Sequence, residues 1–131
     1  MVMHCLDTSV VVDFLRGNRH IIDKITKLVE EEKVFLTSIT LCELFKGVYL
    51  SNKVEKELEI VENFIKSVGF LYHDSDSCKY FGEVFAKLHK NGKMTNEFDL
   101  MIASIVKVNN MVLVTMDKRH FENLGVKLEI W

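Results

Sequence analysis

Segments that resemble strands alternate with segments that resemble helices along this chain, and this alternation limits the folds open to it. Short apolar runs predict strands at residues 3–7, 34–37, 70–72, 111–115 and 126–130. Between these runs apolar residues recur at helical spacing, which predicts helices within residues 8–16, 21–29, 41–48, 54–65, 81–91 and 99–108. Alternating strands and helices favour an α/β fold, in which helices cover both faces of a parallel sheet.

The length and composition fit one compact domain. The chain has 131 residues, of which 48% are hydrophobic, with no proline and only six glycines. This predicts a single domain over residues 1–131, with a substantial core and no flexible linker. No apolar run approaches the ~20 residues of a membrane-spanning helix. The first residues do not resemble a secretory signal either, so we expect a soluble, cytoplasmic protein without a membrane partner.

Net charge and cysteine usage exclude two classes of protein. The formal net charge is −2, whereas proteins that coat nucleic acids are usually strongly basic. Any RNA bound here must therefore meet local positive charge or charge supplied by metal ions. The three cysteines, Cys5, Cys42 and Cys78, contain no C-x-x-C pair. They indicate neither a zinc site nor a disulfide framework, and we expect them to be buried free thiols.

Four acidic residues lie where a parallel sheet binds its ligands. In such sheets, ligands bind just beyond the carboxyl ends of the strands. Asp7 ends the first predicted strand, and Asp117 follows the strand at residues 111–115. We expect Glu43 in the first turn of the helix after the second strand, and Asp99 at the start of an apolar helix. All four carboxylates can therefore reach the same edge of the sheet.

Each of these acids also has a structural explanation. Asp7 and Asp117 could be simple N-caps. Glu43 fits a capping box with Thr40, and Asp99 fits a looser one with the asparagine three residues before it. Carboxylates are common at helix starts because the helix dipole favours them. Taken singly, each acid is accounted for without any catalytic role.

The four carboxylates together are harder to explain by capping. Carboxylates gathered at one edge without a cation would repel one another. Hard divalent cations such as Mg²⁺ and Mn²⁺ prefer oxygen ligands and keep several waters. Such a site could hold one ion, or two at about 3.5–4 Å, which would activate a water and neutralise charge on a phosphoryl group.

These motifs, in this order, resemble those of PIN-domain ribonucleases, and specifically the VapC-type toxins of prokaryotic toxin–antitoxin pairs. Asp7 lies in Leu-Asp-Thr-Ser, followed by Phe-Leu-Arg-Gly, and Glu43 lies in Leu-Cys-Glu-Leu-Phe-Lys-Gly. Asp99 lies in Phe-Asp-Leu-Met-Ile-Ala-Ser, and Asp117 lies in Thr-Met-Asp-Lys-Arg-His-Phe. The resemblance covers nearly the whole chain.

The resemblance implies a three-layer α/β/α sandwich with a central parallel sheet of about five strands. It also implies a homodimer, Mg²⁺- or Mn²⁺-dependent endoribonuclease activity on single-stranded or loop RNA, and an antitoxin that blocks the site. The acidic positions of the family, both catalytic and metal-binding, correspond to Asp7, Glu43, Asp99 and Asp117. Ser9 and Thr115 match small hydroxyl positions that could orient Asp7 and Asp117.

Other residues are less specific. Arg16 ends the helix that starts after Asp7 and is our candidate for contacting RNA phosphates, although a solvated surface charge is an alternative. None of the five histidines has the spacing of a metal site. Phe81 and Phe85 lie on an apolar helical stripe, so we expect them in the core and not in a base-stacking platform.

Alternative functions remain open. A phospho-receiver domain and a haloacid-dehalogenase-type phosphatase also use strand-end aspartates, but Thr8 and Ser9 stand where those proteins need a second acid. Both are therefore disfavoured. The remaining alternatives are a stand-alone RNA-processing PIN nuclease without an antitoxin, and a non-catalytic PIN-like module that only binds protein or RNA.

Overall fold

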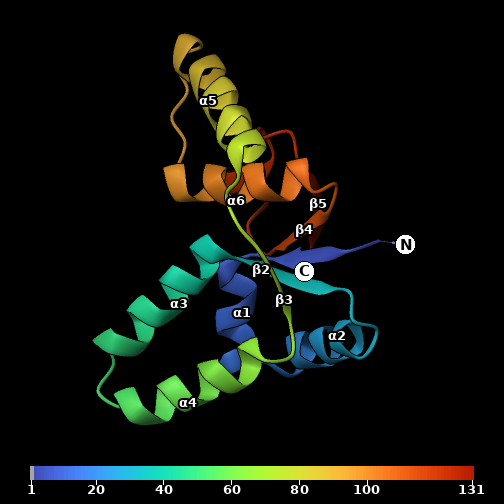
Figure 1. The fold of residues 1–131 in the computed structure, drawn as a ribbon, viewed down its shortest axis with the longest axis vertical. Helices are drawn as coiled ribbons and strands as arrows, with labels where there is room; N and C mark the ends of the chain where they lie inside the picture. Colours follow the sequence, from blue (N-terminus) through green and yellow to red (C-terminus); the bar gives the residue numbers. More distant parts are fainter. Residues whose placement is uncertain (1) are drawn as a thin grey trace.

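A computed structural model describes residues 2–131 of the chain. Met1, which the sequence analysis includes in the single domain, lies outside the described residues. Within residues 2–131, five parallel strands form a sheet in the order β3-β2-β1-β4-β5 (Figure 1). The strands are β1 (His4–Leu6), β2 (Val34–Thr37), β3 (Gly69–Leu71), β4 (Val112–Thr115) and β5 (Lys127–Ile130). The predicted parallel sheet of about five strands is confirmed.

The first strand lies at the centre of this sheet. His4 of β1 is in register with Val34 of β2 on one side and with Val112 of β4 on the other. The chain therefore places the segment after β1 between the segments after β2 and β4, at the carboxyl edge of the sheet.

Seven helices accompany the strands in the described residues. They are α1 (Thr8–Leu15), α2 (Arg19–Glu30), α3 (Ser38–Leu50), α4 (Val54–Ile65), α5 (Ser75–Lys90), α6 (Glu97–Val108) and α7 (Lys118–Phe121). The helices α1 to α4 lie on one side of the sheet and α5 and α6 on the other, while α5 extends away from the body (Figure 1). Among residues 2–131, no helix combines the length and apolar character needed to span a bilayer.

The central strands are buried on both faces, which gives the fold its three layers. Successive side chains of a strand point to opposite faces. Leu6 and Val114 belong to the apolar cluster packed against α1 to α4, whereas their neighbours Cys5 and Leu113 belong to the cluster packed against α6 and α7. All four side chains are fully buried. Continuous apolar runs are typical of such doubly covered parallel strands.

The structure corrects the predicted start of one helix. Helix α3 begins at Ser38, and the Thr37 side chain is its cap because its hydroxyl accepts a hydrogen bond from Thr40 N at 3.2 Å. Thr40 therefore does not cap the helix, and the predicted capping box with Glu43 is wrong. Glu43 lies in the second turn of α3, not in the first.

Two predictions of burial are also wrong. Cys5 is buried, but Cys42 and Cys78 are exposed. Phe81 is partly buried against the cluster under α6, whereas Phe85 is 37% exposed and stacks between Phe81 and His89. Its α5 neighbours Phe81, Val84 and Leu88 pack against the cluster under α6, whereas Phe85 packs against neither apolar cluster.

Candidate active site

Asp7 is a buried carboxylate held by three hydrogen bonds. It follows β1, and its backbone N–H donates to Val114 O of β4 at 2.8 Å. Its carboxylate accepts from Thr8 N at 2.8 Å, from Ser9 Oγ at 3.0 Å and from Thr115 Oγ1 at 2.9 Å. Only 7% of Asp7 is exposed. Its position and orientation are therefore fixed by the junction of β1, α1 and β4.

Thr115 connects Asp7 to the segment of Asp117. Its hydroxyl donates to Asp7 Oδ2 and accepts from Asp117 N at 3.0 Å. Both Ser9 and Thr115 thus orient the Asp7 carboxylate, while Thr115 reaches only the main chain of Asp117. Asp117 precedes α7, but its side chain makes no capping hydrogen bond in the described part of the chain. The N-cap explanation therefore leaves its carboxylate unexplained.

Glu43 joins the group through a threonine pair that sequence reasoning missed. Thr8 Oγ1 donates to Glu43 Oε1 at 2.7 Å, and the Thr8 and Thr40 hydroxyls lie 3.0 Å apart. A hydroxyl has one proton to donate, so Thr40 must donate to Thr8 when Thr8 donates to Glu43. The pair orders Glu43 toward the start of α1, next to Asp7.

Asp99 lies at the start of α6 and faces a histidine. Asn96 caps this helix, because its Oδ1 accepts from Asp99 N at 3.1 Å. His120 Nδ1 lies 3.3 Å from Asp99 Oδ2, and His120 Nε2 lies 3.3 Å from Asp117 Oδ2. The imidazole of His120 therefore lies between the two carboxylates. The sequence analysis gave no sign of this bridging position of His120.

The electrostatics of Asp99 show that the four predicted acids are neighbours. Burial and the charge of Asp7, with smaller contributions from Glu43 and Asp117, raise the pKa of Asp99 to about 6, although His120 acts to lower it. Burial also raises the pKa of Asp7, although its hydrogen bonds oppose that rise. Added positive charge at this edge would therefore lower the electrostatic energy of the folded protein.

The donor chemistry of the group suits a hard divalent cation. All four side chains offer carboxylate oxygens, which Mg²⁺ and Mn²⁺ prefer. In the arrangement that the structure gives for residues 2–131, no three Asp, Glu, His or Cys side chains are close enough together to enclose a metal ion. Because Mg²⁺ keeps several of its waters, an ion at this group would be held partly through water.

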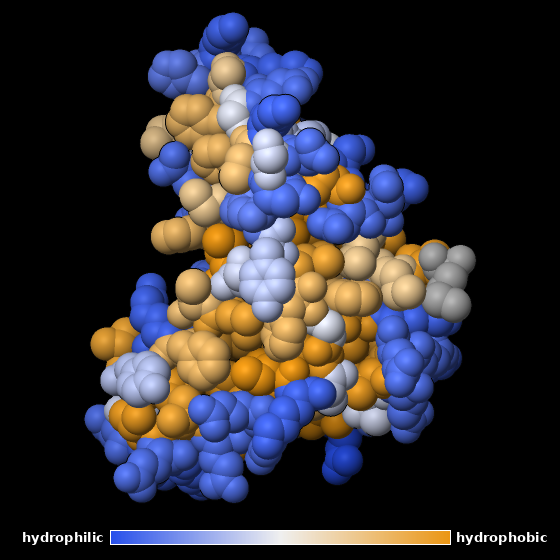
Figure 2. All heavy atoms as spheres, in the orientation of Figure 1, coloured by the Kyte–Doolittle hydropathy of each residue, from blue (hydrophilic) through white to orange (hydrophobic). Residues whose placement is uncertain are grey.

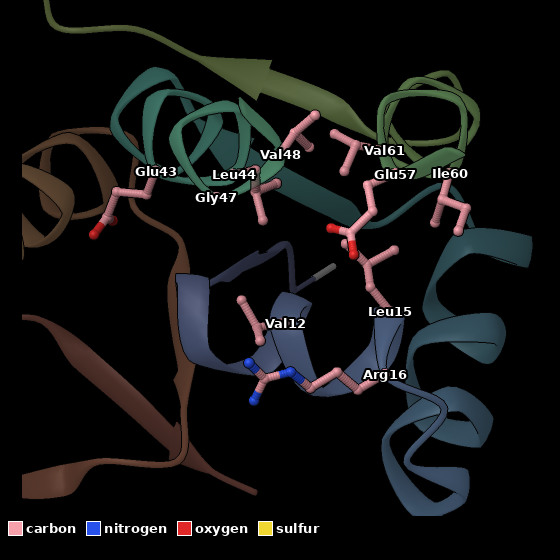
Figure 3. A pocket seen from close by; sticks show the side chains of 10 residues that line it. All are labelled: Val12, Leu15, Arg16, Glu43, Leu44, Gly47, Val48, Glu57, Ile60 and Val61. Atoms are coloured by element: carbon pink, nitrogen blue, oxygen red, sulfur yellow. The ribbon is translucent and has the colours of Figure 1, made fainter. Parts of the chain in front are cut away.

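Arg16 does not join the carboxylates. It lies at the end of α1 and forms no ion pair within the described residues. With Glu43 it lines a pocket of about 270 Å³ between α1, α3 and α4, which we call the α1–α3 groove. Figure 3 shows the Arg16 guanidinium directed back along α1 past Val12, while Glu57 enters the groove from α4.

Replacing Thr115 with the equally shaped valine should weaken the site without changing the fold. Asp7 Oδ2 would lose a donor and Asp117 N an acceptor, so we expect a loss of about 1–3 kcal/mol of unfolding free energy. Loss of a side chain that orients a metal ligand typically costs about 10–100-fold in metal affinity. Thermal unfolding and calorimetric titration with Mn²⁺ measure the two effects. Thr26→Val, at an exposed position of α2, is the control, and an unchanged Mn²⁺ affinity in Thr115→Val would contradict the prediction.

Comparison with known proteins identifies close similarities over the whole chain. A family model described as the PIN domain matches residues 4–127. The tRNA(fMet)-specific endonuclease VapC of Shigella flexneri is 27% identical over an alignment of 132 positions, which covers 100% of this chain and 99% of the relative. Ribonuclease VapC3 of Methanocaldococcus jannaschii is 36% identical over 100 residues, which are 76% of this chain and 94% of the relative. The DNA-bound VapBC structure from Salmonella typhimurium has a TM-score of 0.91 at 29% identity, covering 100% of this chain and 99% of that one.

Proposed function

This chain belongs to the PIN domain family and, within it, to the VapC ribonucleases, and we propose that it is a divalent-metal-dependent endoribonuclease that hydrolyses phosphodiesters in single-stranded or loop RNA. The observation that carries the proposal is the raised pKa of Asp99, to which burial and the charges of Asp7, Glu43 and Asp117 contribute. A bound cation would relieve the electrostatic repulsion among these four carboxylates.

In this mechanism Asp7, Glu43, Asp99 and Asp117 would hold one or two Mg²⁺ or Mn²⁺ ions, directly or through water. When bound, the ion supplies an activated water and neutralises charge developing on the phosphoryl group. Ser9 and Thr115 keep the Asp7 carboxylate in one orientation. Thr8 fixes one oxygen of Glu43. These hydrogen bonds pre-organise the ligands, so that little ordering is needed when the ion and RNA bind.

We further propose that the protein acts in the cytoplasm as the toxin of a toxin–antitoxin pair and forms a homodimer. The Salmonella structure that it resembles is a VapBC complex, which supports an antitoxin partner. The α1–α3 groove adds support, because it is lined mainly by aliphatic side chains next to Glu43. Tyr49, Leu50 and Ile60 are exposed by 63%, 77% and 41%, and Figure 2 shows apolar side chains gathered over α3 and α4.

The proposed activity is tested by incubating purified, antitoxin-free protein with structured RNAs, initiator tRNA among them, and mapping the product ends. Cleavage should require Mg²⁺ or Mn²⁺, stop with EDTA and return when the ion is restored. A non-catalytic module would give no cleavage at any ion concentration. Induced expression should also arrest bacterial growth if the protein is a toxin, whereas growth without arrest alongside cleavage in vitro would favour a stand-alone processing nuclease.

A further inference from the structure

A second pocket adjoins the carboxylates and differs in character from the α1–α3 groove. It has a volume of about 360 Å³ and lies between the end of α5, the loop of residues 91–96, the start of α6 and α7. Asp99 and His120 both line it, so it opens directly onto the candidate active site. We call it the flanking pocket and define it by Leu88, Lys93, Asn96, Arg119, Asn123 and Leu124.

The flanking pocket combines apolar contact surface with unpaired positive charge. Leu88 and the buried Leu124 provide the apolar part. Lys93 and Arg119 are exposed, and neither forms an ion pair with any acid among residues 2–131. By contrast, the nearby His120 is already engaged by Asp99 and Asp117. Because they have no acidic partner, Lys93 and Arg119 are available to an anionic ligand, although the chain as a whole has a net charge of −2.

Two amide side chains give the pocket hydrogen-bonding groups of both kinds. The Asn123 side chain forms no hydrogen bond in the described part of the chain, so its donors and its acceptor are free. Asn96 uses its oxygen to cap α6, which leaves its amide nitrogen as a donor. Amides pair well with the edges of nucleobases because they present a donor and an acceptor side by side.

The pocket thus offers three kinds of contact that a nucleotide can use. The apolar surface and the free amides suit its base, and the unpaired cations suit its phosphate. We propose that the flanking pocket binds the nucleotide next to the scissile phosphate of a single-stranded RNA, with Arg119 contacting its phosphate and Asn123 contacting its base. An unstacked base can enter such a pocket, whereas a base in a duplex cannot. The inference rests on the proposed nuclease function, and it assigns base preference to residues outside the carboxylate group.

The test measures RNA binding separately from cleavage. Fluorescence anisotropy follows labelled hexaribonucleotides of A, C, G or U with Ca²⁺, and a gel verifies that the RNA stays intact. Arg119→Gln should weaken binding about fivefold to tenfold through loss of a charged phosphate contact. Lys118→Gln removes the same charge from the neighbouring residue of α7, which does not line the pocket, and should change binding less than about twofold. Asn123→Ala should reduce the difference between the best and worst base at least about fivefold.

The outcomes separate this inference from the proposed function. Equal losses of RNA affinity in Arg119→Gln and Lys118→Gln would overturn the proposed nucleotide binding by the flanking pocket, even if the wild type cleaves RNA. An unchanged base preference in Asn123→Ala would overturn it as well. If the wild type cleaves no RNA with Mn²⁺ but Arg119→Gln and Asn123→Ala change RNA binding as expected, the nucleotide-binding pocket would be supported and the nuclease function rejected. A wild type that neither binds nor cleaves RNA would overturn both. Since the side chains of Arg119 and Asn123 are exposed, circular dichroism should show that their variants keep the fold.

Discussion

Asp99→Asn protein should lose at least about 100-fold in RNA cleavage rate while keeping its fold. Loss of residues that merely orient a ligand costs about 10–100-fold, so loss of a charged ligand should cost more. The fold should survive because the cap of α6 uses the Asp99 backbone N–H and not its side chain. Cleavage rates at saturating Mn²⁺, measured beside the wild type, give the comparison.

The matched control for this substitution is Asp76→Asn. Asp76 also lies in the first turn of a helix, α5, but it is exposed and is not among the charges that shift the pKa of Asp99. A general effect of losing a helix-start acid would appear in both variants. Cleavage by Asp99→Asn within a few-fold of the wild-type rate would remove Asp99 from the proposed mechanism.

The same substitution should stabilise the metal-free protein near neutral pH. The pKa of Asp99 is about 6 in the folded protein, against an ordinary value of 3.8. Between these values the folded state binds more protons than the unfolded state, so stability is fully present below pH 4 and is lost as the pH rises through 6. Allowing for solvent screening, Asp99→Asn should gain about 1–2 kcal/mol of unfolding free energy at pH 7.5 and nothing near pH 4.

Urea unfolding in EDTA at pH 4, 6 and 7.5 measures this effect. Mn²⁺ should then stabilise the wild type by about 2.7 kcal/mol when its concentration is 100 times the Kd, and Asp99→Asn much less. Asp76→Asn again serves as control. An Asp99→Asn protein less stable than the wild type at pH 7.5 would show that the contact with His120 outweighs the repulsion among the carboxylates.

The fold could be predicted well because its local and global signals agree. Each buried strand is a short apolar run, and the crossover helices have clear helical periodicity. The wrong predictions concern a helix cap and the burial of a side chain, which depend on tertiary contacts. Thr37 and Thr40 are equally good caps, and only the end of β2 selects Thr37. Phe85 continues an apolar stripe, but it packs against neither apolar cluster and stays 37% exposed.

The candidate site was predictable in outline and not in detail. The rule that ligands bind at the carboxyl ends of parallel strands selects Asp7 and Asp117. The contacts of Thr8 with Glu43 and of His120 with Asp99 depend on how α3 and α7 are rotated against α1 and α6. No pattern in one sequence encodes such rotations. That these four acids bind metal stays a prediction.

The central position of β1 has a consequence for the synthesis of the protein. Asp7 is translated before the other three acids, yet the hydroxyl that orients it belongs to Thr115, which follows 108 residues later. Contacts so distant in sequence form late in folding, because a long loop must close before they are made. A nascent or prematurely terminated chain that stops before β4 therefore lacks one of the two strands that flank β1, and it lacks the Asp117 carboxylate. The chain cannot bring its four acids together until Asp117 has been translated, so every residue between Asp7 and Asp117 is made before the group can form.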